Sequence, residues 1–168
     1  MHYKGDITIR TSTDVEAYKG VTSIGGYLSI LADASLDALI SVGGYLSINA
    51  DADLGALTRI EGDLDILVEA ELGALTSVGG YINIDAEAKL GALTSVGGWI
   101  SIEADADLGA LTSIGGDLYI LADADLGALT SVGGELHIDA GTNVRIAALH
   151  KSRKGHLAGM KDASKRIA

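Results

Sequence analysis

A repeat of eighteen residues is the feature that most constrains the fold of this chain. The glycine pair that marks the repeat recurs at Gly25-Gly26, Gly43-Gly44, Gly79-Gly80, Gly97-Gly98, Gly115-Gly116 and Gly133-Gly134. At Glu61-Gly62 the first glycine is replaced. The spacing gives seven units over residues 21–146, and a divergent eighth unit, "GDITIRTSTDV", precedes them. Such fixed self-similarity is typical of a solenoid, in which each unit buries its apolar face only against its neighbours.

Within each unit, small or apolar residues alternate with polar ones in steps of two. One copy shows this at Ile82, Ile84, Ala86, Ala88 and Leu90. Alternation is typical of a β-strand, whose successive side chains point to opposite faces. The glycine density and the two-residue period both argue against helical units. The sequence therefore predicts an all-β fold, a parallel β-solenoid of about seven to eight 18-residue coils with short helical caps.

One column of the repeat is isoleucine in all seven units, at Ile30, Ile48, Ile66, Ile84, Ile102, Ile120 and Ile138. We expect this column to form a ladder of β-branched side chains inside a parallel sheet. The second glycine of the pair is also glycine in all seven units, whereas Glu61 takes the first place once. We therefore assign the backbone constraint, a positive φ or a close approach, to the second glycine.

The strand segment carries the pattern Leu75-x-x-Val78-x-Gly80-x-Ile82-x-Ile84. This pattern resembles the strand segment of receptor L-domain and leucine-rich-like repeats, and the "LTSVGGYLSI" repeats of uncharacterised bacterial and phage proteins. The resemblance covers the repeat region and implies a solenoid fold without implying an activity. The absence of Pro, Cys and Phe also suits a strongly regularised repeat, either a consensus or engineered sequence or a natural array of recent duplications.

A left-handed β-helix is the alternative architecture. The unit divides into the hexads "VGGYIN", "IDAEAK" and "LGALTS", and the last two resemble the hexapeptide of that fold. The first hexad does not fit, because Ile82 stands where a small residue is expected. The aliphatic column of Leu75 is also unexplained by hexads. We favour the right-handed solenoid, in keeping with the usual hand of parallel crossovers.

The solenoid ends need covers, because exposed strand edges promote end-to-end growth. We divide the chain into an N-terminal capping coil and turn (1–20), seven repeats (21–146) and a basic, helical C-terminal cap (147–168). At the N-terminus, "TDVE" over Thr13 to Glu16 matches a capping box, with Gly20 as the C-cap. In the tail, residues 156–167 place Leu157, Met160 and Ile167 close to one helical face.

Charge is divided unevenly along the chain. Residues 1–144 hold five Lys or Arg against 22 Asp or Glu, and the remaining tail holds seven against one. The acidic body can attract the basic tail, and the alternative role of the tail is to bind nucleic acid or an acidic partner. Nucleic acid is nevertheless not an expected partner of the whole chain. No apolar run is long enough to span a bilayer, and the start lacks a secretory signal, so we expect no membrane partner and a cytoplasmic location.

An aromatic stripe is predicted on the outer face of the main strand. It consists of Tyr27, Tyr45, Tyr81 and Trp99, with Asp63, Asp117 and Glu135 completing the column. Because coils stack about 4.8 Å apart, we expect Tyr27/Tyr45 and Tyr81/Trp99 to be stacked pairs. Cross-strand stabilisation is the favoured role of these rings. The alternative is a binding face, since exposed aromatics are enriched at interfaces.

An acidic ladder is the second predicted feature, and it consists of Asp33, Asp51, Glu69, Glu87, Asp105 and Asp123. A parallel column at Asp53, Glu71, Asp107 and Asp125 is interrupted by Lys89. Eighteen-residue coils also occur in calcium-binding β-rolls, but their G-G-x-G-x-D ligand pattern is absent here. We favour a solvated acidic face that preserves solubility. Nucleic-acid mimicry and weak divalent-cation binding are the alternatives.

No catalytic constellation is evident, so we expect neither an enzyme nor a cofactor. The chain has no Cys, and no Ser has a His and a carboxylate implied nearby. Two functional hypotheses remain. The first is a structural repeat scaffold, natural or engineered, whose role is its own folded solenoid and whose candidate partner is a second copy that binds through the ends or faces. The second is a binding module that engages a protein or a cation through the aromatic stripe or the acidic ladder.

Overall fold

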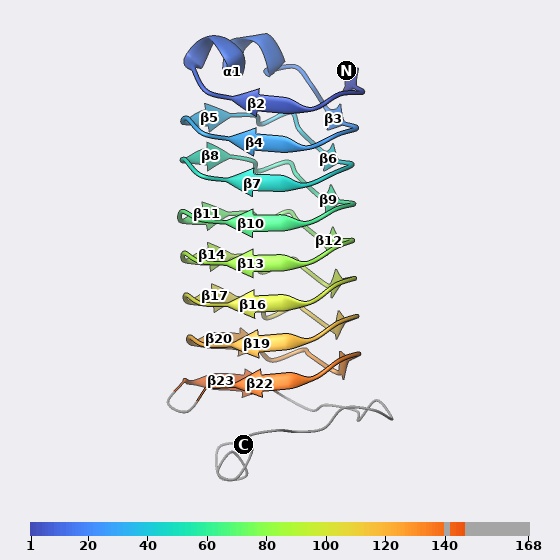
Figure 1. Cartoon of the computed structure of the whole chain (residues 1–168), viewed down its shortest axis with the longest axis vertical. Coiled ribbons are helices and arrows are strands. Elements are labelled where there is room, and N and C mark those ends of the chain that lie inside the picture. The colour runs from blue at the N-terminus through green and yellow to red at the C-terminus, as the bar shows by residue number, and fades with distance from the viewer. Residues whose placement is uncertain (140–141, 147–168) are drawn as a thin grey trace.

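The computed structural model describes residues 1–139 and 142–146 and shows a parallel β-solenoid of about eight coils. Figure 1 shows the coils stacked in one column, with the helix α1 (Ser12–Tyr18) across the N-terminal end. The all-β prediction is confirmed, whereas the hand of the coil stays a prediction. The predicted C-terminal cap, residues 147–168, lies outside the described residues. Within the part described, no helix has both the length and the apolar character needed to cross a membrane.

Two eight-stranded parallel sheets run the length of the solenoid. The first sheet contains β1 (His2–Tyr3), β3 (Ser23–Ile24), β6 (Ser41–Val42), β9 (Arg59–Ile60), β12 (Ser77–Val78), β15 (Ser95–Val96), β18 (Ser113–Ile114) and β21 (Ser131–Val132). The second sheet contains β2 (Ile7–Ile9), β4 (Leu28–Ile30), β7 (Leu46–Ile48), β10 (Leu64–Ile66), β13 (Ile82–Ile84), β16 (Ile100–Ile102), β19 (Leu118–Ile120) and β22 (Leu136–Ile138).

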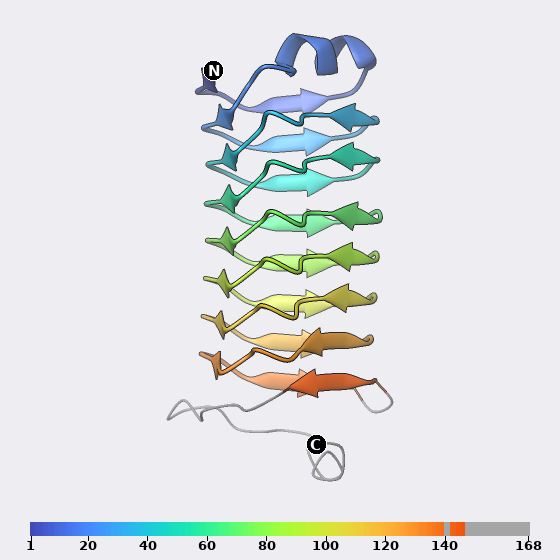
Figure 2. The ribbon, with the colours of Figure 1, turned by 180° about the vertical axis from the view of Figure 1, so that it is seen from behind.

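The third face of the coil is divided between two shorter sheets. One contains β5 (Ala34–Ser35) and β8 (Ala52–Asp53). The other contains β11 (Ala70–Glu71), β14 (Ala88–Lys89), β17 (Ala106–Asp107), β20 (Ala124–Leu126) and β23 (Val144–Ile146). Figure 2 shows this face in front, behind which lie the strands of the second sheet. The second and third faces are therefore opposite sides of a flattened coil.

The strand register confirms the eighteen-residue period. Ile84 pairs with Ile66 on one side and with Ile102 on the other. The two end coils depart from this period. In the first coil Ile7 pairs with Leu28, because α1 takes the place of a third-face strand. In the last coil Ala124 pairs with residue 144, so two extra residues separate the paired positions there.

The core is a set of aliphatic columns inside the coil. The predicted isoleucine ladder is confirmed, with every member fully buried except Ile138 in the last coil, which is half-buried. Leu75 is also fully buried. Ala86, predicted among the inward residues, is only half-buried and lies at a corner. The buried side chains of one coil are Val78, Ile82, Ile84, Ala88, Leu90 and Leu93. Each large aliphatic side chain contributes about 1.5–3 kcal/mol by burial, so the repeated core stabilises every coil against its neighbours.

The glycine pairs lie where successive corners stack backbone on backbone. A Cβ atom added to Gly98 would lie 2.7 Å from the carbonyl carbon of Gly80. One added to Gly97 would lie 2.1 Å from the carbonyl oxygen of Gly79. Neither glycine has a left-handed φ, so the close approach alone explains the preference for glycine. The predicted close approach at the second glycine is confirmed. The first glycine is crowded as well, but Glu61 shows that its position accepts a side chain.

The helix α1 covers the first coil as predicted, but its cap differs from the prediction. Thr11 is the N-cap, and Asp14 completes the capping box by accepting from the Thr11 backbone N–H at 2.9 Å. Hydrogen bonds from the Arg10 backbone and the Thr11 side chain lower the pKa of Asp14. The predicted capping box, Thr13 to Glu16, is therefore wrong. The sequence rule requires Glu or Gln at the third helical position, and Asp occupies that position here. The C-cap is Lys19, one residue before the predicted Gly20.

A break in the third face separates β8 from β11. In the coils before and after it, alanine and leucine amides donate to the next coil, for example Ala34 to Asp51 at 2.9 Å and Ala70 to Glu87 at 3.1 Å. Among the described contacts, Ala52 makes no equivalent bond to the next coil. The ribbons in Figure 2 are also more widely spaced between β8 and β11 than between β5 and β8.

Val68 accounts for the break. It occupies a column that is alanine in the other described coils, at Ala32, Ala50, Ala86, Ala104 and Ala122. Val68 is half-buried and packs against the core at the corner that leads into β11. Its two additional methyl groups need space that an alanine-lined corner does not provide.

Replacing Val68 by Ala should therefore close the third face. We expect the amides of Ala52 and Leu54 to exchange with solvent roughly fivefold to tenfold more slowly, the effect of one net hydrogen bond. Residue-resolved hydrogen exchange measures this. The matched substitution Ala86→Val should have the opposite effect one coil later, at Ala70 and Leu72. Unchanged exchange at Ala52 and Leu54 in the Val68→Ala variant would contradict the explanation.

Candidate functional site

The outward face of the second sheet carries the most varied chemistry of the solenoid. In each coil, strand alternation turns leucine and isoleucine inward and leaves the residues between them outward. We call the positions just before the strands the outer column and the positions at mid-strand the middle column. The outer column contains the aromatic stripe, and the middle column is Ser29, Ser47, Asp65, Asn83, Ser101, Tyr119 and His137.

Two stacked ring pairs lie on this face. The predicted pair Tyr81/Trp99 is confirmed, with ring centroids 4.6 Å apart and planes 4° from parallel. A second pair, Tyr119/His137, has centroids 4.8 Å apart and an interplanar angle of 2°. We did not predict this pair, although its eighteen-residue spacing in the middle column was visible in the sequence. The face therefore carries aromatic rings in two columns.

The predicted stack of Tyr27 on Tyr45 is wrong, since no ring contact between them is present among the described residues. The Tyr45 hydroxyl instead donates to Asp65 Oδ2 at 2.6 Å. Burial first, and then this hydrogen bond, raise the pKa of Tyr45 to about 12. A hydrogen bond to a charged acceptor contributes about 1.5–3 kcal/mol, more than the ~0.5–1.5 kcal/mol of a ring pair. Tyr45 therefore leans toward the middle column, and Tyr27 is left 42% exposed.

A groove of about 620 Å³, which we call the sheet groove, runs between the two ring pairs. Its lining residues are Asp65, Tyr81, Asn83, Trp99, Ser101, Glu103, Asp117 and Tyr119. The small side chains of Asn83 and Ser101 form its floor between larger neighbours in the same grid. Three carboxylates line it, and no basic side chain is among its lining residues. One oxygen, Asp65 Oδ1, is buried without a hydrogen-bond partner in the described structure. The groove is thus both aromatic and negatively charged.

The acidic ladder lies on the opposite, third face, and all six of its side chains are exposed. A broad groove of about 1010 Å³ spans the break between β8 and β11 and is lined by Asp33, Asp51, Asp53, Glu69 and Glu71. Lys89 forms an ion pair with Glu71 across neighbouring strands, and this hydrogen bond raises the pKa of Lys89. Hydrogen bonds from Asn143 lower the pKa of Asp123.

The ladder carboxylates stand side by side along the solenoid. Within residues 1–139 and 142–146, no group of three or more His, Asp or Glu side chains is placed to hold a metal ion. Like charges spaced by one coil repel one another modestly and favour solvation. The arrangement therefore offers a charged surface rather than a set of converging ligands.

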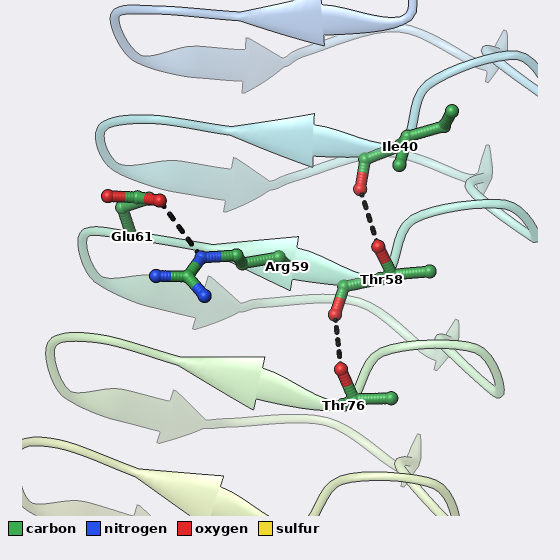
Figure 3. Close-up of polar contacts among 5 residues, drawn as sticks. All are labelled: Ile40, Thr58, Arg59, Glu61 and Thr76. Atoms are coloured by element: carbon green, nitrogen blue, oxygen red, sulfur yellow. Dashed lines mark hydrogen bonds and ion pairs between the residues drawn. The ribbon is translucent and has the colours of Figure 1, made fainter.

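A threonine column connects the coils along one edge, and Figure 3 shows two of its members. The Thr58 hydroxyl donates to the Ile40 carbonyl at 3.1 Å, and the Thr76 hydroxyl donates to the Thr58 carbonyl at 2.9 Å. Thr94, Thr112 and Thr130 continue the series. These hydroxyls satisfy backbone carbonyls, so the column is structural. The ion pair of Arg59 with Glu61, at 2.9 Å, lies beside the threonine column. Because both side chains are exposed, this pair contributes little to the stability of the fold.

In comparisons with known proteins, no family model, no curated protein and no solved structure matches this chain. The fold and the repeat are thus established by the structure, and the likeness of the strand motif to leucine-rich-like repeats has no support beyond the residues that suggested it.

Proposed function

We propose that this protein is a non-catalytic repeat scaffold that binds a protein partner on the outward face of its second sheet. The observation that carries the proposal is the sheet groove, flanked by ring pairs that remain accessible. Trp99 is 38% exposed and Tyr119 is 37% exposed. Tyr and Trp are the residues most enriched among the side chains that dominate binding energy at interfaces. The inward positions are aliphatic, so the outward faces are the parts left to carry function.

The sheet groove is a better candidate than the acidic ladder. A row of exposed like charges is sufficiently explained by solubility. The broad groove on that face is lined only by carboxylates and small side chains, with no aromatic ring to anchor a partner. The sheet groove combines ring edges, a small-residue floor and three carboxylates within four successive coils. A rigid solenoid also presents these groups preorganised, which reduces the entropy cost of binding.

The partner should be basic. The carboxylates of the sheet groove meet no basic lining residue, and residues 1–144 hold 22 acidic against five basic side chains. Complementary charge accelerates association and makes it salt-dependent. We therefore expect binding to weaken as ionic strength rises, while the contribution of the rings persists.

A second copy of the chain is the other candidate partner. The helix α1 packs over β2 at the N-terminal end, whereas β21, β22 and β23 each pair on one side only among the described strands. Open strand edges favour self-association. We also propose that the strand motif is related to L-domain repeats and that the sequence has a consensus or engineered origin. The invariant isoleucine column supports a strongly regularised sequence.

The proposal is tested by photo-crosslinking from one exposed position on each face. A benzoylphenylalanine at Leu121, beside the sheet groove, should yield a specific adduct in cells that produce the full chain. The same group at Asp107, on the third face, should not yield it. Trp99→Ser should abolish the adduct, and the matched change Tyr27→Ser outside the groove should leave it. A crosslinked dimer would identify a second copy as the partner. The same adducts from both faces, or none, would contradict the proposal.

A further inference from the structure

The middle column of the second sheet contains a ring stack that ends at a small residue. Tyr119 pairs with His137 on one neighbouring strand and with Ser101 on the other. The centroid separation of 4.8 Å between Tyr119 and His137 equals the spacing of adjacent strands. The stack therefore runs along the solenoid axis, with one face of the Tyr119 ring covered by His137. The other face is turned toward the level of Ser101.

Ser101 cannot cover that second face. Its side chain ends at a single hydroxyl and lines the sheet groove between larger neighbours, which leave the residue only 8% exposed. Trp99 and Glu103 lie two residues before and after it, and strand alternation brings both to the same face. We call the space above Ser101, bounded by Tyr119, Trp99 and Glu103, the vacant rung. Along the solenoid axis the vacant rung has room for one planar group, because the next coil follows at the strand spacing.

The carboxylate of Glu103, beside the vacant rung, is available to pair with a ligand. Among the described residues the Glu103 carboxylate has no hydrogen-bond or ion-pair partner. Asp117 is already engaged, since its Oδ1 accepts from the Glu135 backbone N–H at 2.7 Å. A ligand in the rung thus meets the Glu103 carboxylate, the rings of Tyr119 and Trp99, and Asn83 on the next strand.

We propose that the vacant rung binds the guanidinium group of an arginine from the basic partner, stacked on Tyr119 and paired with Glu103. This inference rests on the proposed function and specifies the chemistry of that site. A guanidinium is planar and weakly hydrated, stacks on aromatic faces and pairs with carboxylates through its fork of N–H donors. A lysine ammonium is compact, strongly hydrated and not planar, so it cannot continue the stack. A neutral ring could stack but would leave Glu103 unpaired.

Three blocked pentapeptides test the assignment on the full chain: Gly-Gly-Arg-Gly-Gly and its lysine and citrulline counterparts. Citrulline keeps the planar shape and removes the charge, whereas lysine keeps the charge and removes the plane. Trp99 is the only tryptophan of the chain, so its fluorescence reports on this site, and the Ser101 and Tyr119 amide shifts locate the peptide. We expect the arginine peptide to bind about tenfold more tightly than either counterpart. Equal affinity of all three would overturn the assignment.

Two substitutions address the rung directly. Ser101→Tyr should fill it with a ring that continues the stack, so the protein should stay folded while the arginine response is lost. Ser29→Tyr, in the same column outside the sheet groove, is the matched control and should leave the response intact. Glu103→Gln keeps the shape and should weaken arginine binding about tenfold, which covers the case in which Ser101→Tyr fails to fold. Unchanged arginine binding in Glu103→Gln, or in a folded Ser101→Tyr protein, would overturn the inference.

The two proposals fail in different ways. If the arginine peptide binds selectively but Leu121 yields no crosslinked adduct, the arginine site is supported and the proposed protein partner is contradicted. An adduct without arginine selectivity would contradict only the vacant rung. The isolated chain could also show no response to the arginine peptide and gain that response in the double variant Arg153→Gln with Arg166→Gln. This result would make the chain's own tail the occupant of the rung and would overturn the assignment to a partner.

Discussion

The substitution Ile84→Asp is expected to abolish folding of the solenoid. Ile84 is fully buried in the isoleucine ladder, between Ile66 and Ile102 on the neighbouring strands. Removal of the side chain alone costs about 2–5 kcal/mol, and an unpaired buried carboxylate adds a desolvation cost of several kcal/mol more. The total approaches the whole stability of a typical domain, about 5–15 kcal/mol. Circular dichroism and urea denaturation of the purified variant measure the loss.

Two neighbouring outward substitutions are the controls for Ile84→Asp. Asn83→Asp introduces the same charge one residue earlier, on the outward side of the same strand. Tyr81→Ser removes one ring of the Tyr81/Trp99 stack. We expect each to cost about 2 kcal/mol or less, well below Ile84→Asp. Tyr81→Ser loses a cross-strand ring contact, and Asn83→Asp loses the hydrogen bond from Asn83 Nδ2 to Asp85 Oδ1 at 3.0 Å and faces Asp65 on the neighbouring strand. A mild effect of Ile84→Asp, comparable to these two, would contradict the inward register.

The substitution Gly98→Ala is expected to destabilise the protein by about 3 kcal/mol or more, the upper range for overpacking. An added Cβ would lie 2.8 Å from the Gly80 carbonyl oxygen and 2.8 Å from the Tyr81 backbone nitrogen. These are backbone atoms held by the ladder, where the Gly98 N–H donates to the same Gly80 oxygen at 2.8 Å. Relief of the clash requires these backbone atoms to move apart. Urea denaturation gives the change in the free energy of unfolding.

Gly73→Ala is the matched control, because an added Cβ there meets no atom within 4 Å. Gly73 also has no left-handed φ. We expect its replacement to be neutral or to stabilise by up to about 1 kcal/mol through a lower entropy of the unfolded chain. If Gly98→Ala and Gly73→Ala have equal effects, the stacked glycine corners do not limit the approach of the coils.

The architecture and the core register follow from the sequence alone. In a solenoid, residues one period apart become neighbours on adjacent strands, so a column in the sequence is a row of contacts in space. For this reason the isoleucine ladder and the Tyr81/Trp99 stack are predictable from spacing, without knowledge of the rest of the fold. The exposure of the acidic ladder follows in the same way from strand alternation.

Only the tertiary structure decides how neighbouring columns interact with one another. Tyr45 leaves its own column to bind Asp65 in the next one, because a charged acceptor competes better than a ring. The sheet groove exists because small side chains at Asn83 and Ser101 lie between large ones in two directions. The break beside Val68 likewise depends on how closely one corner packs. These outcomes depend on side-chain conformation and lateral packing, and a one-dimensional period contains neither.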